Sequence, residues 1–166
     1  MPQRIGENLA SGDDEASLGL RQASITTIAK ISVERWQAYK QARLYKELAG
    51  LHDGSLNRLA RGRALLGAGV FYAQAGLVRK SANVLVAAQE DLEHYLSASH
   101  TWDAYLGSYF VSSALGNSYE WSDQPEKSEL ARSRASELAI EMEEYFGISV
   151  VDFLNDPHSM TLDHLQ

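Results

Sequence analysis

Hydrophobic residues recur along most of the chain at steps of three to five positions, the spacing that places side chains on one face of an α-helix. The first such stretch covers residues 17–49. Its hydrophobic positions are Ile25, Ile28, Ile31, Trp36, Tyr39, Ala42, Tyr45 and Leu48. Gly50 is the predicted end of this helix, and Ser17 or Ser24 is its predicted N-cap. Residues 1–16 are polar and lack this periodicity, so they predict a flexible tail.

Four further stretches with helical spacing follow, and no stretch has the alternation of a strand. They predict helices over residues 56–75, 79–97, 102–115 and 125–146, with a short helical turn at 150–154. The fold class is therefore predicted to be all-α, with about five helices arranged as an antiparallel helix-hairpin array or a bundle. A single domain is expected over residues 17–155, followed by a loose tail at 156–166.

The segments between these helices carry turn and capping signals. Ser55 and Thr101 are predicted N-caps. Asp123 followed by Pro125 is typical of a helix start, because an N-cap side chain and an early proline both suit the first turn. Residues 116–124 are accordingly predicted to form a polar loop before the fifth helix.

Glycines recur every seven residues in the second predicted helix, at Gly62, Gly69 and Gly76. A glycine inside a helix costs about 1 kcal/mol relative to alanine. A column of glycines therefore suggests that a neighbouring backbone approaches closely, although chance spacing is the alternative explanation. The third glycine opens a predicted break at residues 76–78, where the chain would turn back into the third helix.

Composition places the chain among ordinary globular proteins of one domain. It has 166 residues, 45% hydrophobic and 22% charged, and no apolar run reaches the about 18 residues of a membrane span. Asp13, Asp14 and Glu15 interrupt the N-terminal region where a secretory signal would be apolar, so a cytoplasmic location is expected. The absence of cysteine excludes disulfides, thiolate zinc sites and a cysteine nucleophile.

Charge is divided unevenly along the chain. Residues 1–20 have a net charge of −3, residues 21–82 of +8 and residues 83–166 of −12, which together give −7. The acidic helices either pack beside the basic ones and neutralise them, or the split marks a partner surface, nucleic-acid binding or head-to-tail self-association. Neutralisation is the simplest of these, because successive helices usually lie side by side.

A set of small and large residues around the predicted break resembles a known repeat. The residues are Gly69, Tyr72, Gly76, Ser81, Leu85 and Ala88. Their spacing makes residues 62–95 similar to a tetratricopeptide unit, a helix pair of about 34 residues. A second, degenerate match covers residues 100–139, with an insertion before Pro125. The resemblance implies an array of antiparallel helix pairs over about half the chain.

The resemblance also implies a concave face that binds a partner peptide. Family members often hold a peptide's terminal carboxylate with lysine and asparagine on this face. The matching positions are Arg63, Leu66, Val70 and Gln74, of which only Arg63 is cationic. An apolar groove for a partner helix therefore fits this sequence better than a carboxylate clamp.

These observations predict a small protein that binds another protein, or a second copy of itself, and is not an enzyme. The expected site is a groove between the second and fourth helices, and the opposite charges of the two segments would steer the encounter. The predicted partner-binding residues are Arg63, Val70, Gln74, Tyr105 and Ser108. No catalytic residues, metal ligands or cofactor are predicted.

Nucleic-acid binding through the basic segment 21–82 is one alternative. Its candidate residues are Lys40, Arg43, Lys46, Arg58, Arg61 and Arg63. The acidic overall charge and the lack of a nucleic-acid recognition motif disfavour it.

A metal-dependent hydrolase of nucleotides is the other alternative. Glu90 and Glu93, followed by Glu120 and Asp123, resemble the acidic pattern of all-α nucleotide pyrophosphatases, which hold magnesium between two helices. The proline at 125 places the second acidic pair in a loop or a helix cap, which does not suit that arrangement. None of the five histidines pairs with another at helical spacing.

Overall fold

The structure, a computed structural model, describes residues 10–52 and 57–156, with side chains from residue 23 onward apart from residue 25. It contains six helices and, within these ranges, no strand, which confirms the all-α fold. The helices are α1 (Ala10–Leu51), α2 (Arg58–Gln74), α3 (Val78–Ala98), α4 (Trp102–Trp121), α5 (Pro125–Phe146) and α6 (Val150–Asn155).

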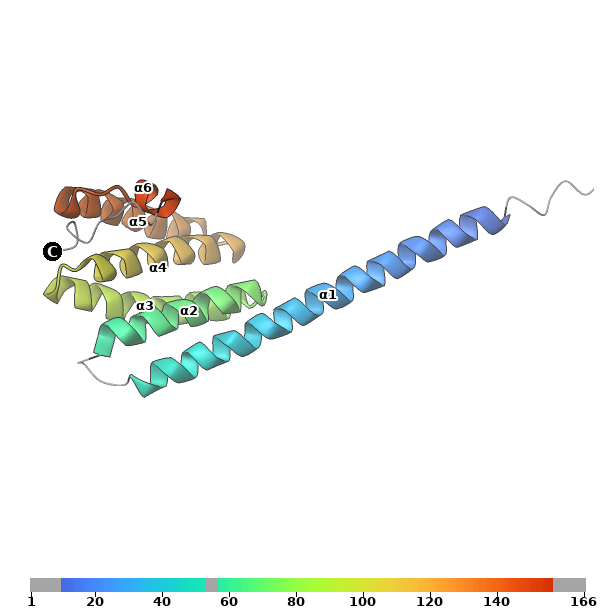
Figure 1. The fold of residues 1–166 in the computed structure, drawn as a ribbon, viewed down its shortest axis with the longest axis horizontal. Coiled ribbons are helices and arrows are strands. Elements are labelled where there is room, and N and C mark those ends of the chain that lie inside the picture. Colours follow the sequence, from blue (N-terminus) through green and yellow to red (C-terminus); the bar gives the residue numbers. More distant parts are fainter. Residues whose placement is uncertain (1–9, 53–56, 157–166) are drawn as a thin grey trace, which may run out of the picture.

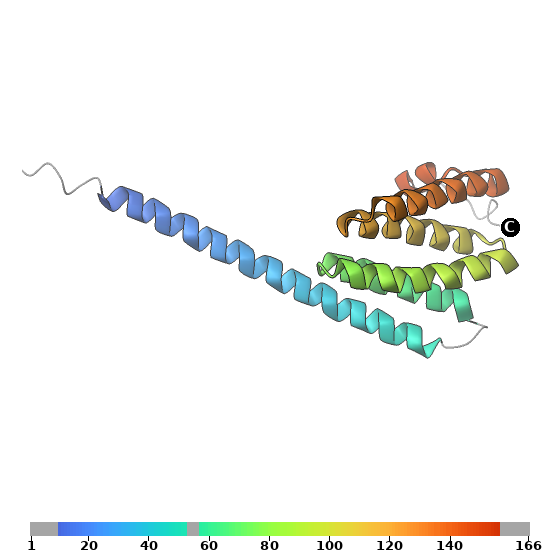
Figure 2. The ribbon, with the colours of Figure 1, turned by 180° about the vertical axis from the view of Figure 1, so that it is seen from behind.

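The five long helices stack as an array in which each one packs against the next along the chain (Figure 1). Successive long helices run antiparallel, and α2 also contacts α4. The short α6 lies against α5. This order leaves α1 and α5 as the two ends of the array (Figure 2).

The first helix is longer than the sequence predicts and extends well beyond the bundle (Figure 1). It begins at Ala10, whereas the predicted start was Ser17, and it continues past Gly50 to Leu51. Residues 10–16, predicted as part of a flexible tail, have helical backbone, and residues 1–9 of that tail lie outside the described ranges.

The predicted hairpin between the second and third helices is confirmed. Gly76 has a φ of +79°, a left-handed conformation that glycine adopts without strain, and the Leu77 N–H donates to the Tyr72 carbonyl at 2.9 Å. A Cβ atom built on Gly69 would lie 2.5 Å from Leu85, and one built on Gly62 would lie 2.7 Å from Leu92. The glycine column therefore allows α3 side chains to reach the α2 backbone.

Two clusters of buried side chains form the core. The first contains residues from all five long helices, and its large side chains include Tyr72, Leu85, Leu92 and Leu115. The second joins the end of α3 with α4, α5 and α6 and contains Leu96, Ala104, Tyr105, Leu138, Met142 and Val150. The first cluster supports the surface between α2 and α4, where a partner site is predicted.

The fourth helix is also longer than predicted. It runs to Trp121, six residues past the expected end at Leu115, so the predicted polar loop is mostly helix. Small residues pack this extension. Ser118 shares a buried hydrogen bond with Ser81 at 3.0 Å, and the Ser128 hydroxyl donates to the Gly116 carbonyl at 2.8 Å. Residues 116–121 resemble a polar loop in sequence because this part of α4 contacts the neighbouring helices through serine and glycine instead of large apolar residues.

The structure changes part of the predicted capping. The Thr101 side chain accepts a bond from the Ala104 N–H at 3.4 Å, as predicted. Asp123 is not an N-cap: it has a φ of +58° in the turn, and Gln124 precedes α5 without a side-chain cap. Ser55 lies outside the described residues.

Candidate functional site

A groove runs between α2 and α4, with α3 as its floor. It has a volume of about 230 Å³. The walls come from α2 and α4, and Ser81 and Leu85 come from α3. The remaining lining residues are Val70, Ala73, Gln74, Ala114, Asn117, Ser118 and Trp121.

The structure brings only two of the five predicted partner-binding residues into this groove. Val70 and Gln74 line the α2 wall and are exposed. Arg63 is exposed nearer the start of α2, where its guanidinium lies 3.6 Å from the Asp103 carboxylate. Tyr105 and Ser108 are buried, at 4% and 0% exposure, because they face the core between α4 and its neighbours. These two side chains are therefore not at a surface that a partner reaches.

Sequence reasoning missed the residues that form the α4 wall. Ala114, Asn117 and Trp121 face the groove, and Trp121 is 63% exposed. Two of them lie in the segment that was predicted to be a loop. The sequence did contain one signal that the helix continues. Trp121 follows Phe110 by eleven residues, about three helical turns, so both aromatic side chains would lie on one face of a longer helix.

The groove combines apolar walls with uncharged polar groups. Val70, Leu85 and Trp121 provide apolar surface, while Gln74 and Asn117 place side-chain amides on opposite walls. None of its nine lining residues carries a titratable side chain. The groove can therefore bury apolar side chains and exchange hydrogen bonds, which is the chemistry of binding.

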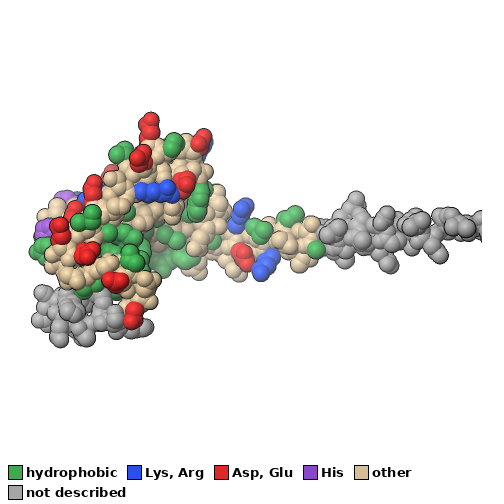
Figure 3. All heavy atoms as spheres, turned by 90° about the horizontal axis from the view of Figure 1, so that it is seen from above, with side chains coloured by type: hydrophobic (Ala, Val, Ile, Leu, Met, Phe, Trp, Pro, Cys, Tyr) green, Lys and Arg blue, Asp and Glu red, His purple; other side chains and the backbone are tan. Residues whose placement is uncertain are grey.

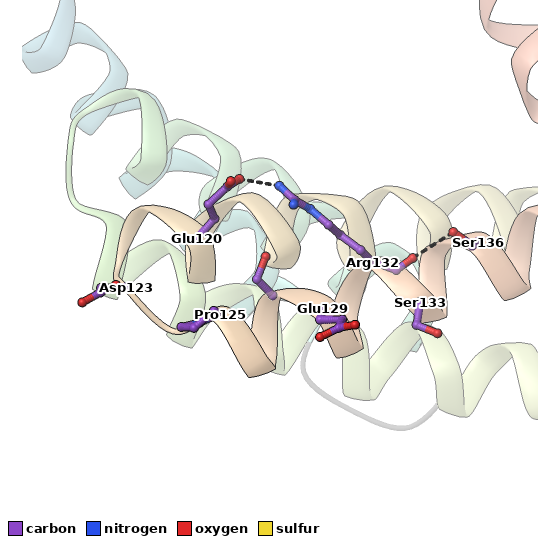
Figure 4. Close-up of a pocket in the computed structure, with 8 residues that line it drawn as sticks. Glu120, Asp123, Pro125, Glu129, Arg132, Ser133 and Ser136 are labelled. Carbon is purple, nitrogen blue, oxygen red and sulfur yellow. Dashed lines mark hydrogen bonds and ion pairs between the residues drawn. The ribbon is translucent and has the colours of Figure 1, made fainter.

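A larger and more open hollow lies where α4 ends and α5 begins (Figure 4). Glu120 and Arg132 form an ion pair at its edge, and Asp123 and Glu129 also line it. On α3, Glu93 makes two hydrogen bonds of 2.9 Å with Arg134. Two of the four carboxylates proposed for a nucleotide hydrolase, Glu93 and Glu120, are thus paired with arginines on α5.

Metal-ligating side chains do not gather anywhere in the described part of the chain. Among residues 23–52 and 57–156, no three His, Asp or Glu side chains lie close enough to hold one ion. Glu90, Glu93, Glu120 and Asp123 do not form such a group.

Four arginines of the basic segment pair with carboxylates. Asp91 on α3 lies between two α2 arginines: its Oδ2 is 2.9 Å from Arg61 Nε and its Oδ1 is 3.6 Å from an Arg58 nitrogen. Arg63 pairs with Asp103, and Arg43 pairs with Glu47. Three of these four arginines therefore meet carboxylates of the acidic segment, so the two segments partly neutralise each other within the fold.

Burial gives Tyr105 an unusual ionisation. Desolvation raises the pKa of its phenol above the ordinary 10.0, and the nearby Glu141 carboxylate raises it further. Its hydroxyl also shares a 3.2 Å hydrogen bond with His100 Nδ1. The fold thus favours the neutral phenol, and this part of its stability is present below pH 10 and is lost as the pH rises through the pKa of the folded state.

We expect the destabilisation caused by Tyr105→Phe to become smaller at high pH. At pH 8 the variant should be less stable by about 1 kcal/mol, because the bond to His100 is lost. Above pH 10 this deficit should shrink, because phenylalanine has no proton to release. Urea unfolding of both proteins from pH 8 to 11 measures the difference. A deficit that stays constant over this range would contradict the assignment.

Comparison with known proteins adds no relative: no family model matches the chain, and no curated protein or solved structure matches it.

Within the described residues, no helix combines the length and the apolar character that crossing a membrane requires.

Proposed function

We propose that this chain is a non-enzymatic protein-interaction module that binds a segment of a partner protein in the α2/α4 groove. One observation carries the proposal. Trp121 is 63% exposed at the edge of an apolar hollow that Val70 and buried Leu85 also line. Exposed aromatic residues beside a pocket are typical of the positions that supply most of the binding energy in protein interfaces.

The groove favours an amphipathic helix as the bound segment. A volume of about 230 Å³ accommodates apolar side chains from one face of a helix, but not the helix itself. Such a helix would lie along α2 and α4 and insert side chains spaced three or four residues apart. The amides of Gln74 and Asn117 would bond polar groups at the edges and set its orientation.

The two alternatives have weaker support. Nucleic-acid binding would draw on cations of which four already pair with carboxylates, at Arg43, Arg58, Arg61 and Arg63. Nucleotide hydrolysis would need carboxylates that converge on an ion, and Glu93 and Glu120 instead bind arginines.

Trp121→Ala is expected to remove partner binding. The variant loses the exposed indole at the groove, and we expect binding to weaken by about thirtyfold or more, the effect of a hot-spot residue worth about 2 kcal/mol. Immobilised wild-type and variant chains are incubated with extract of the source cells, and the retained proteins are identified and titrated.

Trp36→Ala is the matched control, because Trp36 is 56% exposed on α1, away from the groove. A groove partner is a protein that binds the wild type and the Trp36 variant equally but is lost with Trp121→Ala. Equal retention by all three chains would refute the groove as the binding site.

A further inference from the structure

The two end helices of the array carry apolar residues that are exposed in the described part of the chain. An array of stacked helices normally has polar outer faces at its ends, because these faces meet water. Among the described residues α1 packs mainly against α2, and α5 packs mainly against α4. Apolar residues on the outer faces of α1 and α5 would therefore indicate surfaces that bind another molecule.

The outer face of α1 carries a stripe of leucines. Leu44, Leu48 and Leu51 are spaced i, i+4 and i+7, which places them on one side of the helix. They are 57%, 42% and 80% exposed. The opposite side of α1 is the one that packs on α2, where Ala42 and Ala49 are buried. We refer to Leu44, Leu48 and Leu51 as the leucine stripe.

The outer face of α5 is apolar at two positions and acidic around them. Leu130 and Ile140 are 71% and 58% exposed, while Leu138 and Met142 on the other side are fully buried. Figure 3 looks onto this end of the array and shows acidic side chains spread over it with hydrophobic ones between them. Glu129 and Glu144 are exposed members of this surface.

The two end helices have opposite net charge. Residues 23–51 of α1 contain five Lys or Arg and two Glu, a net charge of +3. Helix α5 contains three Lys or Arg and six Glu, a net charge of −3. Lys40 and Arg43 are exposed beside the leucine stripe. Opposite fields of this kind favour the encounter of the two faces and disfavour the contact of either face with itself.

From these faces we infer that the chain assembles head to tail with a second copy of itself, α1 of one copy packing on α5 of the next. The leucine stripe covers Leu130 and Ile140 of the neighbour, and the surrounding cations face its glutamates. A second copy is the favoured occupant because the same chain supplies both complementary faces. The interface is heterologous, so it propagates into a ring or an open chain.

A charge-exchange experiment tests this inference. Lys40→Glu combined with Arg43→Glu makes the α1 face acidic, and Glu129→Lys combined with Glu144→Lys makes the α5 face basic. Each double variant alone should associate about tenfold or more weakly than the wild type, because its two faces now repel. An equal mixture of the two variants should associate again, since each α1 face then meets an α5 face of opposite charge. Sedimentation velocity at about 0.05 M salt, where screening is weak, measures both effects.

The outcomes separate this interface from other modes. If α1 paired with α1, the α5 variant would associate like the wild type, which would overturn the inference. A wild-type chain that stays monomeric at high concentration would overturn it as well. Trp121→Ala, placed in the groove and not on either end face, should leave the assembly unchanged, so failure of the groove proposal and failure of this one are distinguishable.

Discussion

Replacing Gly69 with alanine should destabilise the protein by about 2 kcal/mol. The new Cβ would lie 2.5 Å from two atoms of Leu85, a side chain with no exposed surface and no room to withdraw. Overpacking of this kind costs about 1–3 kcal/mol, and here we expect the upper end of that range, partly offset by the about 1 kcal/mol that alanine gains over glycine in a helix. Chemical denaturation followed by circular dichroism measures the change.

Gly50→Ala is the matched control, because nothing lies within 4 Å of a Cβ at this helical position. It should stabilise the protein by up to about 1 kcal/mol, since only the gain in helix propensity remains. A double variant, Gly69→Ala with Leu85→Ala, should be no less stable than Leu85→Ala alone, because the clash is removed. Equal effects of alanine at positions 50 and 69 would refute the close packing of α2 on α3.

Replacing Asp91 with alanine should destabilise the protein by about 2–3 kcal/mol. The Asp91 side chain is 3% exposed and lies between Arg58 and Arg61, so its removal takes a carboxylate partner from two partly buried cations. Removing one member of a buried pair costs about 3–5 kcal/mol. We expect a smaller destabilisation for Asp91→Ala, because both arginine side chains are about one-third exposed and can turn toward water.

The matched control for this charge is Glu47→Ala. Glu47 pairs with Arg43 at 3.6 Å on the surface of α1, and both side chains are more than half exposed. Exposed pairs of this kind contribute about 0.5 kcal/mol or less, so this variant should unfold almost like the wild type. If both variants had the same small effect, the carboxylate on α3 would not link α2 to α3.

The hydrophobic spacing was sufficient to predict where most helices lie. Helix α5 matches its prediction at both ends, because Pro125 starts it and Gly147, with a φ of +68°, ends it. The hairpin between α2 and α3 was also predictable from its glycines. Gly76 allows a left-handed turn, and Gly62 and Gly69 mark a close approach that larger residues would prevent. These are local signals, and the tertiary structure agrees with them.

The segment around residues 116–121 shows where local signals mislead. Its residues are small and polar, and such residues are typical of loops. They form helix because Gly116 packs against Arg132 and Ser118 bonds Ser81, two contacts with residues far away in the sequence. The α4 wall of the candidate groove lies in this segment, so the site could not be assigned completely without these contacts.

The sequence by itself determined the helical fold, the α2–α3 turn and the separation of basic from acidic segments, since each depends on residues close together in the chain. Only the tertiary structure decided which helix faces are covered. Periodicity places Tyr105 and Leu44 on helix faces but does not say which neighbour packs there, and the fold buries the first and exposes the second. That choice arises from packing between distant segments, and it placed Trp121 at the groove and the leucine stripe at the end of the array.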